Sequence, residues 1–219
     1  MRNLFEGKPP LYLISDTTIS NLSHREVFKI AIRGGVKVIQ LREKYMTKKE
    51  IYKEAMVIRR ITKRHGITFI INDYVDLAYI VDADGVHLGQ DDIPLREARR
   101  ILGMDKIIGV STHTLKQAID AENGGADYIG YGPIFHTATK DAGRPKGVGL
   151  LKEIRGRVNI PIVAIGGITL EDLKVVLDTG VDAVAMLSGI LKGNIRENIK
   201  RFMAISGLGR LKDWKICNL

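Results

Sequence analysis

Residues 133–140 bring together residue types that bind phosphate. The segment reads Pro-Ile-Phe-His-Thr-Ala-Thr-Lys and follows a short apolar run at 128–132. Thr137 and Thr139 supply short hydroxyl donors and Lys140 supplies a compact positive charge, and both kinds of group suit phosphate oxygens. We therefore expect a phosphate-binding loop just after a strand.

Four other segments place polar residues where an apolar run ends. They read Gln40-Leu-Arg-Glu-Lys44, Ile71-Asn-Asp73, Gly89-Gln-Asp-Asp92 and Val110-Ser111. One such loop is weak evidence, but several in equivalent positions predict a shared site for a doubly phosphorylated ligand and a metal ion.

The composition is that of a globular protein. The chain has 219 residues, of which 45% are hydrophobic, and we interpret residues 1–219 as one domain of the size of an α/β barrel. No stretch approaches the ~18 apolar residues of a membrane helix, and the N-terminal residues lack the apolar core of a signal peptide. Cys217 is the one cysteine, so no internal disulfide can form. These features predict a cytoplasmic protein with no membrane partner.

The formal net charge of +9 comes from 34 basic and 25 acidic residues. The basic residues are spread along the chain, and the sequence contains neither a basic stripe interleaved with aromatic residues nor a nucleic-acid-binding motif. We therefore expect solvated helix faces that also attract phosphorylated substrates, and no nucleic-acid partner. The sequence predicts no particular oligomeric state.

Apolar, β-branched runs alternate with amphipathic stretches along the chain. This alternation indicates parallel βαβ units, and strands buried on both faces read as continuous apolar runs. Eight such runs predict a single (β/α)8 TIM barrel of the α/β class, with an open doubly wound sheet as the alternative. The runs are Leu11–Ser15, Val36–Leu41, Thr68–Ile71, Gly85–Leu88, Ile107–Ser111, Tyr128–Tyr131, Ile160–Ile165 and Ala183–Leu187.

Signals at the helix ends agree with this pattern. Thr47 precedes Glu50 at the spacing of a capping box, and Thr169-Leu-Glu-Asp172 offers a similar start. Glycines follow several helical patterns, as C-terminal caps would. Residues 193–219 are predicted to form a last amphipathic helix and a tail.

In a parallel barrel, the polar residues that follow the strands fall on one rim, where such barrels place their sites. Asp73 and Asp92 follow adjacent strands, and two carboxylates can hold Mg²⁺ together with water and phosphate oxygens. Each could instead cap the following helix, and Asp91 competes with Asp92 on spacing alone. The cations expected nearby, Arg42, Lys44 and Lys140, favour the metal site.

Gly166-Gly167 follows the seventh predicted strand and precedes Thr169. Backbone N–H groups bared by glycine at a helix start can bind phosphate. Loops after strands seven and eight form such sites in these barrels, and here the eighth loop carries Ser188. A simple tight turn is the alternative interpretation.

Two histidines receive different interpretations. His87 lies inside an apolar run, which favours a hydrogen-bonded core residue over a base. His113, two residues after Ser111, is the best acid–base candidate. The sequence contains no Cys/His metal cluster, nucleophile elbow or Walker loop.

Taken in order, these motifs resemble the thiamine-phosphate synthase family over about residues 11–192. The Gln-Leu-Arg-x-Lys and Thr-x-Thr-Lys segments together are the specific ones. The resemblance implies a barrel enzyme that uses Mg²⁺ to join 4-amino-2-methyl-5-hydroxymethylpyrimidine diphosphate to a thiazole phosphate or its carboxylate. The products would be thiamine phosphate and diphosphate. The family's reaction ionises the methylene–oxygen bond before attack, so it needs anion stabilisation more than acid–base groups.

The resemblance also implies a role for each motif. Catalysis would rest on Arg42, Lys44, Ser111 and Lys140. The pyrimidine diphosphate would contact these residues and also Gln40, Leu41, Glu43 and Asn72. The thiazole phosphate would contact Thr137, Ala138, Thr139, Gly167, Leu187 and Ser188. Mg²⁺ would be held by Asp73 and Asp92, which decides against Asp91.

A sister group with the same fold, the thiazole tautomerases, is the alternative. Its reaction is a proton transfer, for which His113 would matter. Lys44 and the segment from Thr137 to Lys140 favour the synthase.

Overall fold

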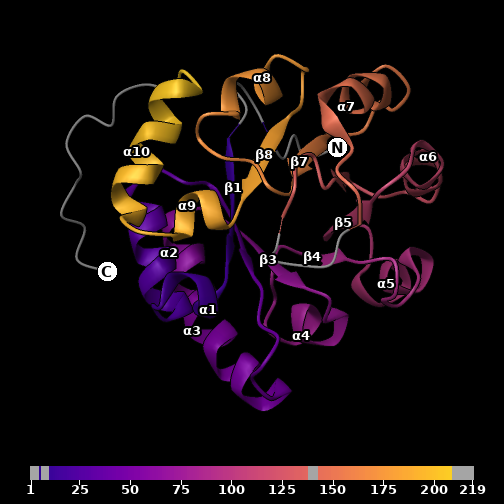
Figure 1. The fold of residues 1–219 in the computed structure, drawn as a ribbon. Coiled ribbons are helices and arrows are strands. Elements are labelled where there is room, and N and C mark those ends of the chain that lie inside the picture. Colours follow the sequence, from indigo (N-terminus) through magenta and orange to yellow (C-terminus); the bar gives the residue numbers. More distant parts are fainter. Residues whose placement is uncertain (1–4, 6–9, 138–142, 209–219) are drawn as a thin grey trace.

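A computed structural model describes residue 5 and residues 10–137 and 143–208 of the chain. Eight parallel strands close into a barrel in the order β1 to β8, and β8 pairs back with β1 through Val184 and Leu11. Helices surround the barrel, as Figure 1 shows. The predicted (β/α)8 barrel is therefore confirmed, and the open doubly wound sheet is excluded.

Each predicted apolar run matches one strand, and β3 and β5 extend one residue beyond their runs. The strands are β1 (Leu11–Ser15), β2 (Val38–Leu41), β3 (Thr68–Asn72), β4 (Gly85–Leu88), β5 (Ile107–Thr112), β6 (Tyr128–Tyr131), β7 (Ile162–Ile165) and β8 (Ala183–Met186).

Two strands begin two residues later than predicted, each for a local reason. The backbone N–H of Val36 donates to the carbonyl of Ala31, so Val36 still belongs to the turn that ends the preceding helix. Pro161 has no N–H to donate to a neighbouring strand, and β7 begins directly after it.

The helices follow the strands in the expected alternation. They are α1 (Thr17–Ser20), α2 (His24–Arg33), α3 (Lys48–His65), α4 (Val75–Ile80), α5 (Leu95–Leu102), α6 (Leu115–Asn123), α7 (Gly147–Arg155), α8 (Leu173–Leu177), α9 (Ser188–Leu191) and α10 (Ile195–Ile205). The capping box of Thr47 and Glu50 starts α3, and Gly66 ends it with φ of +62°, which glycine adopts without strain.

The second predicted helix start is only half right. Thr169 and Asp172 do exchange the reciprocal hydrogen bonds of a capping box, with the Thr169 N–H donating to Asp172 Oδ2 at 3.1 Å and the Asp172 N–H donating to Thr169 Oγ1 at 3.4 Å. Residues 170–172 nevertheless form a turn, and α8 begins only at Leu173. The Gly166-Gly167 turn is therefore not a helix N-terminus.

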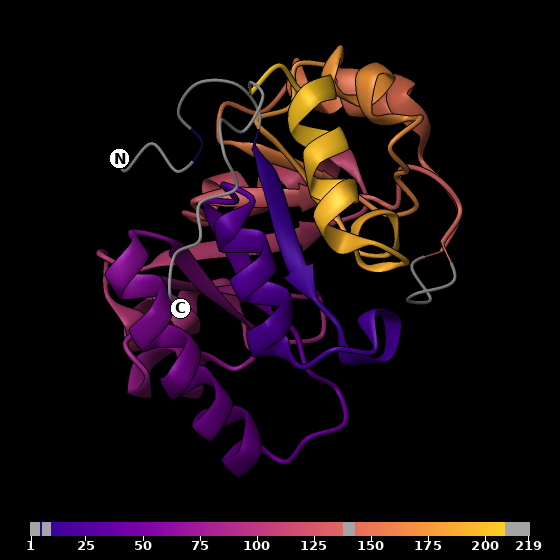
Figure 2. The ribbon, with the colours of Figure 1, turned by 90° about the vertical axis from the view of Figure 1, so that its left-hand side faces the viewer.

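The last described helix, α10, packs against α2 and α9 and lies alongside the barrel (Figure 2). Its buried face consists of Ile195, Ile199, Phe202 and Met203, as the apolar spacing predicts. Across the described ranges, no helix is both long and apolar enough to cross a membrane.

Side chains inside the barrel form a core separate from the one under the helices. Phe5, Tyr12 and Tyr128 belong to this inner core, and the ring of Phe5 packs edge-on against Tyr128 with centroids 5.9 Å apart. Nearer the carboxyl ends of the strands, the inward side chains are polar on β2 to β5, where Gln40, Asn72, His87 and Ser111 lie, and apolar on β1 and β7, where Ile14 and Ile165 lie. Those residues form the floor of the candidate site.

Candidate active site

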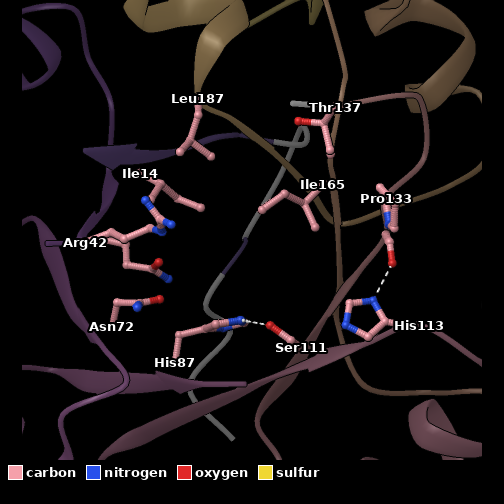
Figure 3. A pocket seen from close by; sticks show the side chains of 13 residues that line it. Ile14, Arg42, Asn72, His87, Ser111, His113, Pro133, Thr137, Ile165 and Leu187 are labelled. Carbon is pink, nitrogen blue, oxygen red and sulfur yellow. Dashed lines mark hydrogen bonds between the residues drawn. The ribbon is translucent and has the colours of Figure 1, made fainter. Parts of the chain in front are cut away.

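A pocket opens at the carboxyl ends of the strands, where (β/α)8 enzymes place their chemistry (Figure 3). Its apolar lining comes from Ile14, Pro133, Ile165 and Leu187 on four different strands or loops. Its polar lining is Gln40, Arg42, Asn72, His87, Ser111, His113 and Thr137. The prediction that residues after separate strands converge on one mouth is therefore confirmed for Arg42, Asn72, Ser111 and Thr137.

The loop after β2 carries Arg42 and Lys44, the two described cations that are predicted to contact the diphosphate. The Arg42 guanidinium donates to the Asp16 carboxylate with Nη1 2.6 Å from Oδ2, and both side chains are mostly buried. Lys44 is more exposed, and its Nζ lies 2.6 Å from Oδ2 of Asp73. Each cation is thus held at the rim by a carboxylate from a neighbouring loop.

Glu43 faces into the protein, between these two cations. Its Oε1 accepts the backbone N–H groups of Lys44 at 2.7 Å and Tyr45 at 2.6 Å, while its Oε2 lies 3.0 Å from Nε2 of the buried His24. Burial opposes ionisation, but the donors outweigh it and hold the pKa of Glu43 below its usual value. The carboxylate therefore fixes the loop, and its predicted ligand contact stays a prediction.

Leu41 also turns away from the pocket. It is buried in the core between the strands and the helices. Any contact of this residue with a ligand would have to come from its main chain.

Asp73 and Asp92 come together although they follow different strands. Asp73 adopts a left-handed conformation, with φ of +64°, at the end of β3. Asp92 Oδ2 accepts the Gly89 N–H at 2.6 Å. Burial raises the pKa of Asp92, and so does the adjacent Asp73 carboxylate. Two such oxygen donors at one rim fit a hard cation, which would relieve their repulsion. Asp91 is exposed beside them.

The three loops predicted to hold the thiazole phosphate lie against one another. Phe135 donates its N–H to the Gly166 carbonyl at 2.9 Å, and a Cβ on Gly167 would overlap the Phe135 and His136 carbonyl oxygens. A Cβ on Gly189, next to Ser188, would lie 2.7 Å from the Ile168 carbonyl oxygen. Close backbone approach therefore requires these glycines. Ala138, Thr139 and Lys140 lie outside the described residues.

His87 was predicted as a core residue, and that is incomplete. Both ring nitrogens do have partners, since Nδ1 lies 2.9 Å from the Tyr128 hydroxyl and Nε2 lies 2.9 Å from Ser111 Oγ. The ring nevertheless lines the pocket (Figure 3). An apolar run cannot show which face of a buried strand a residue occupies. Side chains along a strand alternate between its two faces, so residues two positions apart share a face. Counting back by two from the polar residues that end each strand would have identified His87 as a residue of the barrel interior.

His113 also lines the pocket, as an acid–base candidate should. Its Nδ1 donates to the Gly132 carbonyl oxygen at 2.6 Å (Figure 3). In the neutral ring, Nε2 is then the nitrogen that can accept a proton.

A closed parallel barrel with a polar pocket at the carboxyl ends of its strands has the architecture of an enzyme. The family model for thiamine monophosphate synthase matches residues 11–190, and the chain belongs to that family of transferases.

Individual relatives agree with this assignment. The chain is 44% identical over 196 residues to the thiamine-phosphate synthase of Clostridium acetobutylicum, which covers 88% of this chain and 92% of the relative. It is 49% identical over 170 residues to the thiamine-phosphate synthase of Halalkalibacterium halodurans, and the match covers 77% of this chain and 81% of the relative. The structure of thiamine phosphate pyrophosphorylase from Pyrococcus furiosus matches with a TM-score of 0.85 and 36% identity, covering 94% of this chain and 98% of the other.

Proposed function

We propose that the chain joins 4-amino-2-methyl-5-hydroxymethylpyrimidine diphosphate to 4-methyl-5-(2-phosphoethyl)thiazole, or to its carboxylate, and releases thiamine phosphate and diphosphate. Membership of the family supports this reaction. The observation that carries it is a rim where Lys44, Asp73 and Asp92 meet, directly after Asn72, which lines the pocket together with Arg42. Such a rim suits a diphosphate, which needs both cations and a metal.

Asp73 and Asp92 would hold Mg²⁺, and water and diphosphate oxygens would complete its shell. No third His, Cys, Asp or Glu joins this pair among the residues that the structure describes. That donor set suits Mg²⁺, which usually binds one or two carboxylates and substrate phosphates. When bound, the ion would neutralise charge on the departing diphosphate.

The protein would supply the rest of the leaving-group stabilisation. Lys44 contacts Asp73 of the carboxylate pair, and Arg42, which Asp16 holds, lines the pocket two residues before it. Lys140 would add a third cation. Preorganised cations of this kind act on the charge that develops as the methylene–oxygen bond ionises. Gln40, Asn72 and Ser111 on the floor would orient the pyrimidine.

The thiazole phosphate would bind across the pocket from the diphosphate. Thr137 lines that side, and the Gly166-Gly167 turn and Ser188 lie in the two loops packed beside it. Hydroxyl and main-chain N–H donors suit a monoester anion. Holding the thiazole nitrogen in line with the ionising carbon is the second task of the site.

A thiazole tautomerase remains the alternative, and one observation favours it. His113 lies in the pocket with Nδ1 engaged by Gly132, so its Nε2 could accept a proton from a ligand. The rim of cations and paired carboxylates has no role in such a proton transfer, which is why we favour the synthase.

The experiment offers the purified chain both reactions. One incubation contains both phosphorylated halves and Mg²⁺ and is assayed for thiamine phosphate. The other contains the thiazole carboxylate phosphate alone and is assayed for its tautomer. Coupling supports the proposal, whereas tautomerisation without coupling would replace it with the alternative.

A further inference from the structure

A continuous chain of hydrogen bonds runs through the barrel interior to the pocket. Gln40 Nε2 donates to the Tyr12 hydroxyl at 2.9 Å, and the Tyr12 and Tyr128 hydroxyls are 2.7 Å apart. The Tyr128 hydroxyl lies 2.9 Å from Nδ1 of His87, and Nε2 of His87 lies 2.9 Å from Ser111 Oγ. The chain starts in β2, passes through β1, β6 and β4, and ends in β5.

Counting protons gives this chain a direction. The Gln40 amide nitrogen can only donate, so the Tyr12 hydroxyl accepts from it. The Tyr128 oxygen is then the acceptor within reach of the Tyr12 proton, and Tyr12 donating to Tyr128 is the order in which every hydroxyl proton of the chain has an acceptor. Tyr128 then gives its proton to Nδ1 of His87. Burial raises the pKa of both phenols, so each hydroxyl stays protonated and acts as a hydrogen-bond donor. Neutral His87 must therefore carry its proton on Nε2 and donate it to Ser111 Oγ.

Two glycines make room for the rings in this chain. A Cβ on Gly109 would overlap the phenol ring of Tyr128. A Cβ on Gly130 would lie 3.1 Å from Cε1 of His87, closer than most such contacts. Gly109 on β5 and Gly130 on β6 both face the barrel interior, where a side chain at either position would take the space that a ring of the hydrogen-bond chain occupies. The barrel is therefore shaped around Tyr128 and His87.

We propose that Tyr128 fixes His87 in the Nε2–H tautomer, and that His87 in turn makes the Ser111 hydroxyl a hydrogen-bond donor toward the ligand. Since Ser111 Oγ already accepts from His87, its own proton is directed into the pocket. His87 and Tyr128 are thus positioning residues. This inference rests on the proposed function, and the ligand is therefore the pyrimidine diphosphate. The Ser111 hydroxyl would donate a hydrogen bond to one of its acceptor atoms.

The tautomer can be measured without substrate. Long-range ¹H–¹⁵N spectra of the ¹⁵N-histidine-labelled full chain, at a pH where His87 is neutral, distinguish a protonated from an unprotonated ring nitrogen. We expect His87 to show a protonated Nε2 and an unprotonated Nδ1. The opposite tautomer in the wild-type chain would overturn the proposal, whatever any variant does.

Variants test the consequence for binding. Tyr128→Phe should mix the His87 tautomers and weaken the affinity for pyrimidine diphosphate about tenfold, the effect of one hydrogen bond. Ser111→Ala should cost a similar factor, and the double variant should cost little more than either single one. Tyr131→Phe is the matched control, because Tyr131 lies on the same strand but belongs to the outer core.

Unchanged tautomers and affinity in Tyr128→Phe, or additive losses in the double variant, would contradict the proposal. Failure of the proposed function is distinguishable. In that case the wild-type chain shows the Nε2–H tautomer but no coupling activity.

Discussion

Lys44 Nζ lies 2.6 Å from Asp73 Oδ2, so a predicted diphosphate cation is paired with a predicted Mg²⁺ ligand. The pair links the loop after β2 to the loop after β3. Both side chains retain access to solvent, and pairs of this kind contribute only about 0–1 kcal/mol to stability. Exchanging the pair for a metal ion and a diphosphate therefore costs little, which suits a site that must open to its ligands.

The metal assignment predicts the behaviour of two carboxylate variants. Asp73→Asn and Asp92→Asn should each lower turnover strongly and raise the Mg²⁺ concentration that half-maximal activity requires, because each removes an anionic oxygen ligand. Thermal stability should change little. Steady-state rates across a Mg²⁺ titration measure the effect, and Asp91→Asn, at the exposed neighbouring position, is the control. If both variants kept wild-type activity at low Mg²⁺, Asp73 and Asp92 would not be the Mg²⁺ ligands.

Leaving-group stabilisation predicts a loss of turnover on removing a cation. Arg42→Ala and Lys140→Ala should each lower kcat on the order of 100-fold to 1000-fold, the typical effect of removing one such donor. Arg100→Ala, which removes an exposed cation on α5, should leave kcat unchanged. The measurement separates kcat from KM. A rise in KM with kcat intact would show that these residues bind only the ground state.

The acceptor side separates two kinds of residue. The Thr137→Ala and Thr139→Ala double variant should weaken the affinity for the thiazole phosphate, because it removes two hydroxyl donors. His113→Ala should stay largely active in coupling, since no proton moves in an ionisation step. Initial rates over a range of thiazole phosphate concentrations distinguish the two. Loss of coupling in His113→Ala, with threonine variants unaffected, would reverse the assignment.

The Glu43–His24 pair predicts a stability effect with a defined pH dependence. The folded-state pKa of Glu43 lies below that of an unfolded glutamate, about 4.3. The ionised carboxylate therefore stabilises the fold above that pH, and this contribution is lost as the pH falls through the folded-state pKa. Glu43→Gln should lower the free energy of unfolding at pH 7 by about 1–3 kcal/mol.

The difference between wild type and Glu43→Gln should then narrow below about pH 4. Urea unfolding at pH 7 and at steps below 4.5 measures it. Glu97→Gln removes only an exposed ion pair on α5 and should cost less than about 1 kcal/mol at any pH. A constant difference down to pH 3 would show that the Glu43 carboxylate does not stabilise the loop.

The architecture could be predicted because local signals specify it. Continuous apolar runs place all eight strands, and the capping box at Thr47 starts α3 at the expected residue. The start of α8 could not be predicted this way, because the same reciprocal bonds at Thr169 can close a turn as well as begin a helix. Local chemistry there permits both outcomes.

The candidate site was predictable where polar residues end the strands, and less so inside the barrel. Asp73 and Asp92 were expected at one rim, and the structure brings them together. The hydrogen bond between Tyr12 and Tyr128 joins residues 116 positions apart. Nothing local signals such a contact, because every residue of a strand buried on both faces looks alike in sequence. The role of His87 follows from that contact and was missed with it.

We propose that this pocket couples the two phosphorylated halves of thiamine phosphate. The most direct measurement quantifies thiamine phosphate and diphosphate together, in the presence of Mg²⁺, for the wild-type chain and for the Asp73→Asn, Asp92→Asn double variant. We expect equal amounts of the two products from the wild type and almost none from the variant. Diphosphate release without thiamine phosphate, or full product formation by the variant, would contradict it.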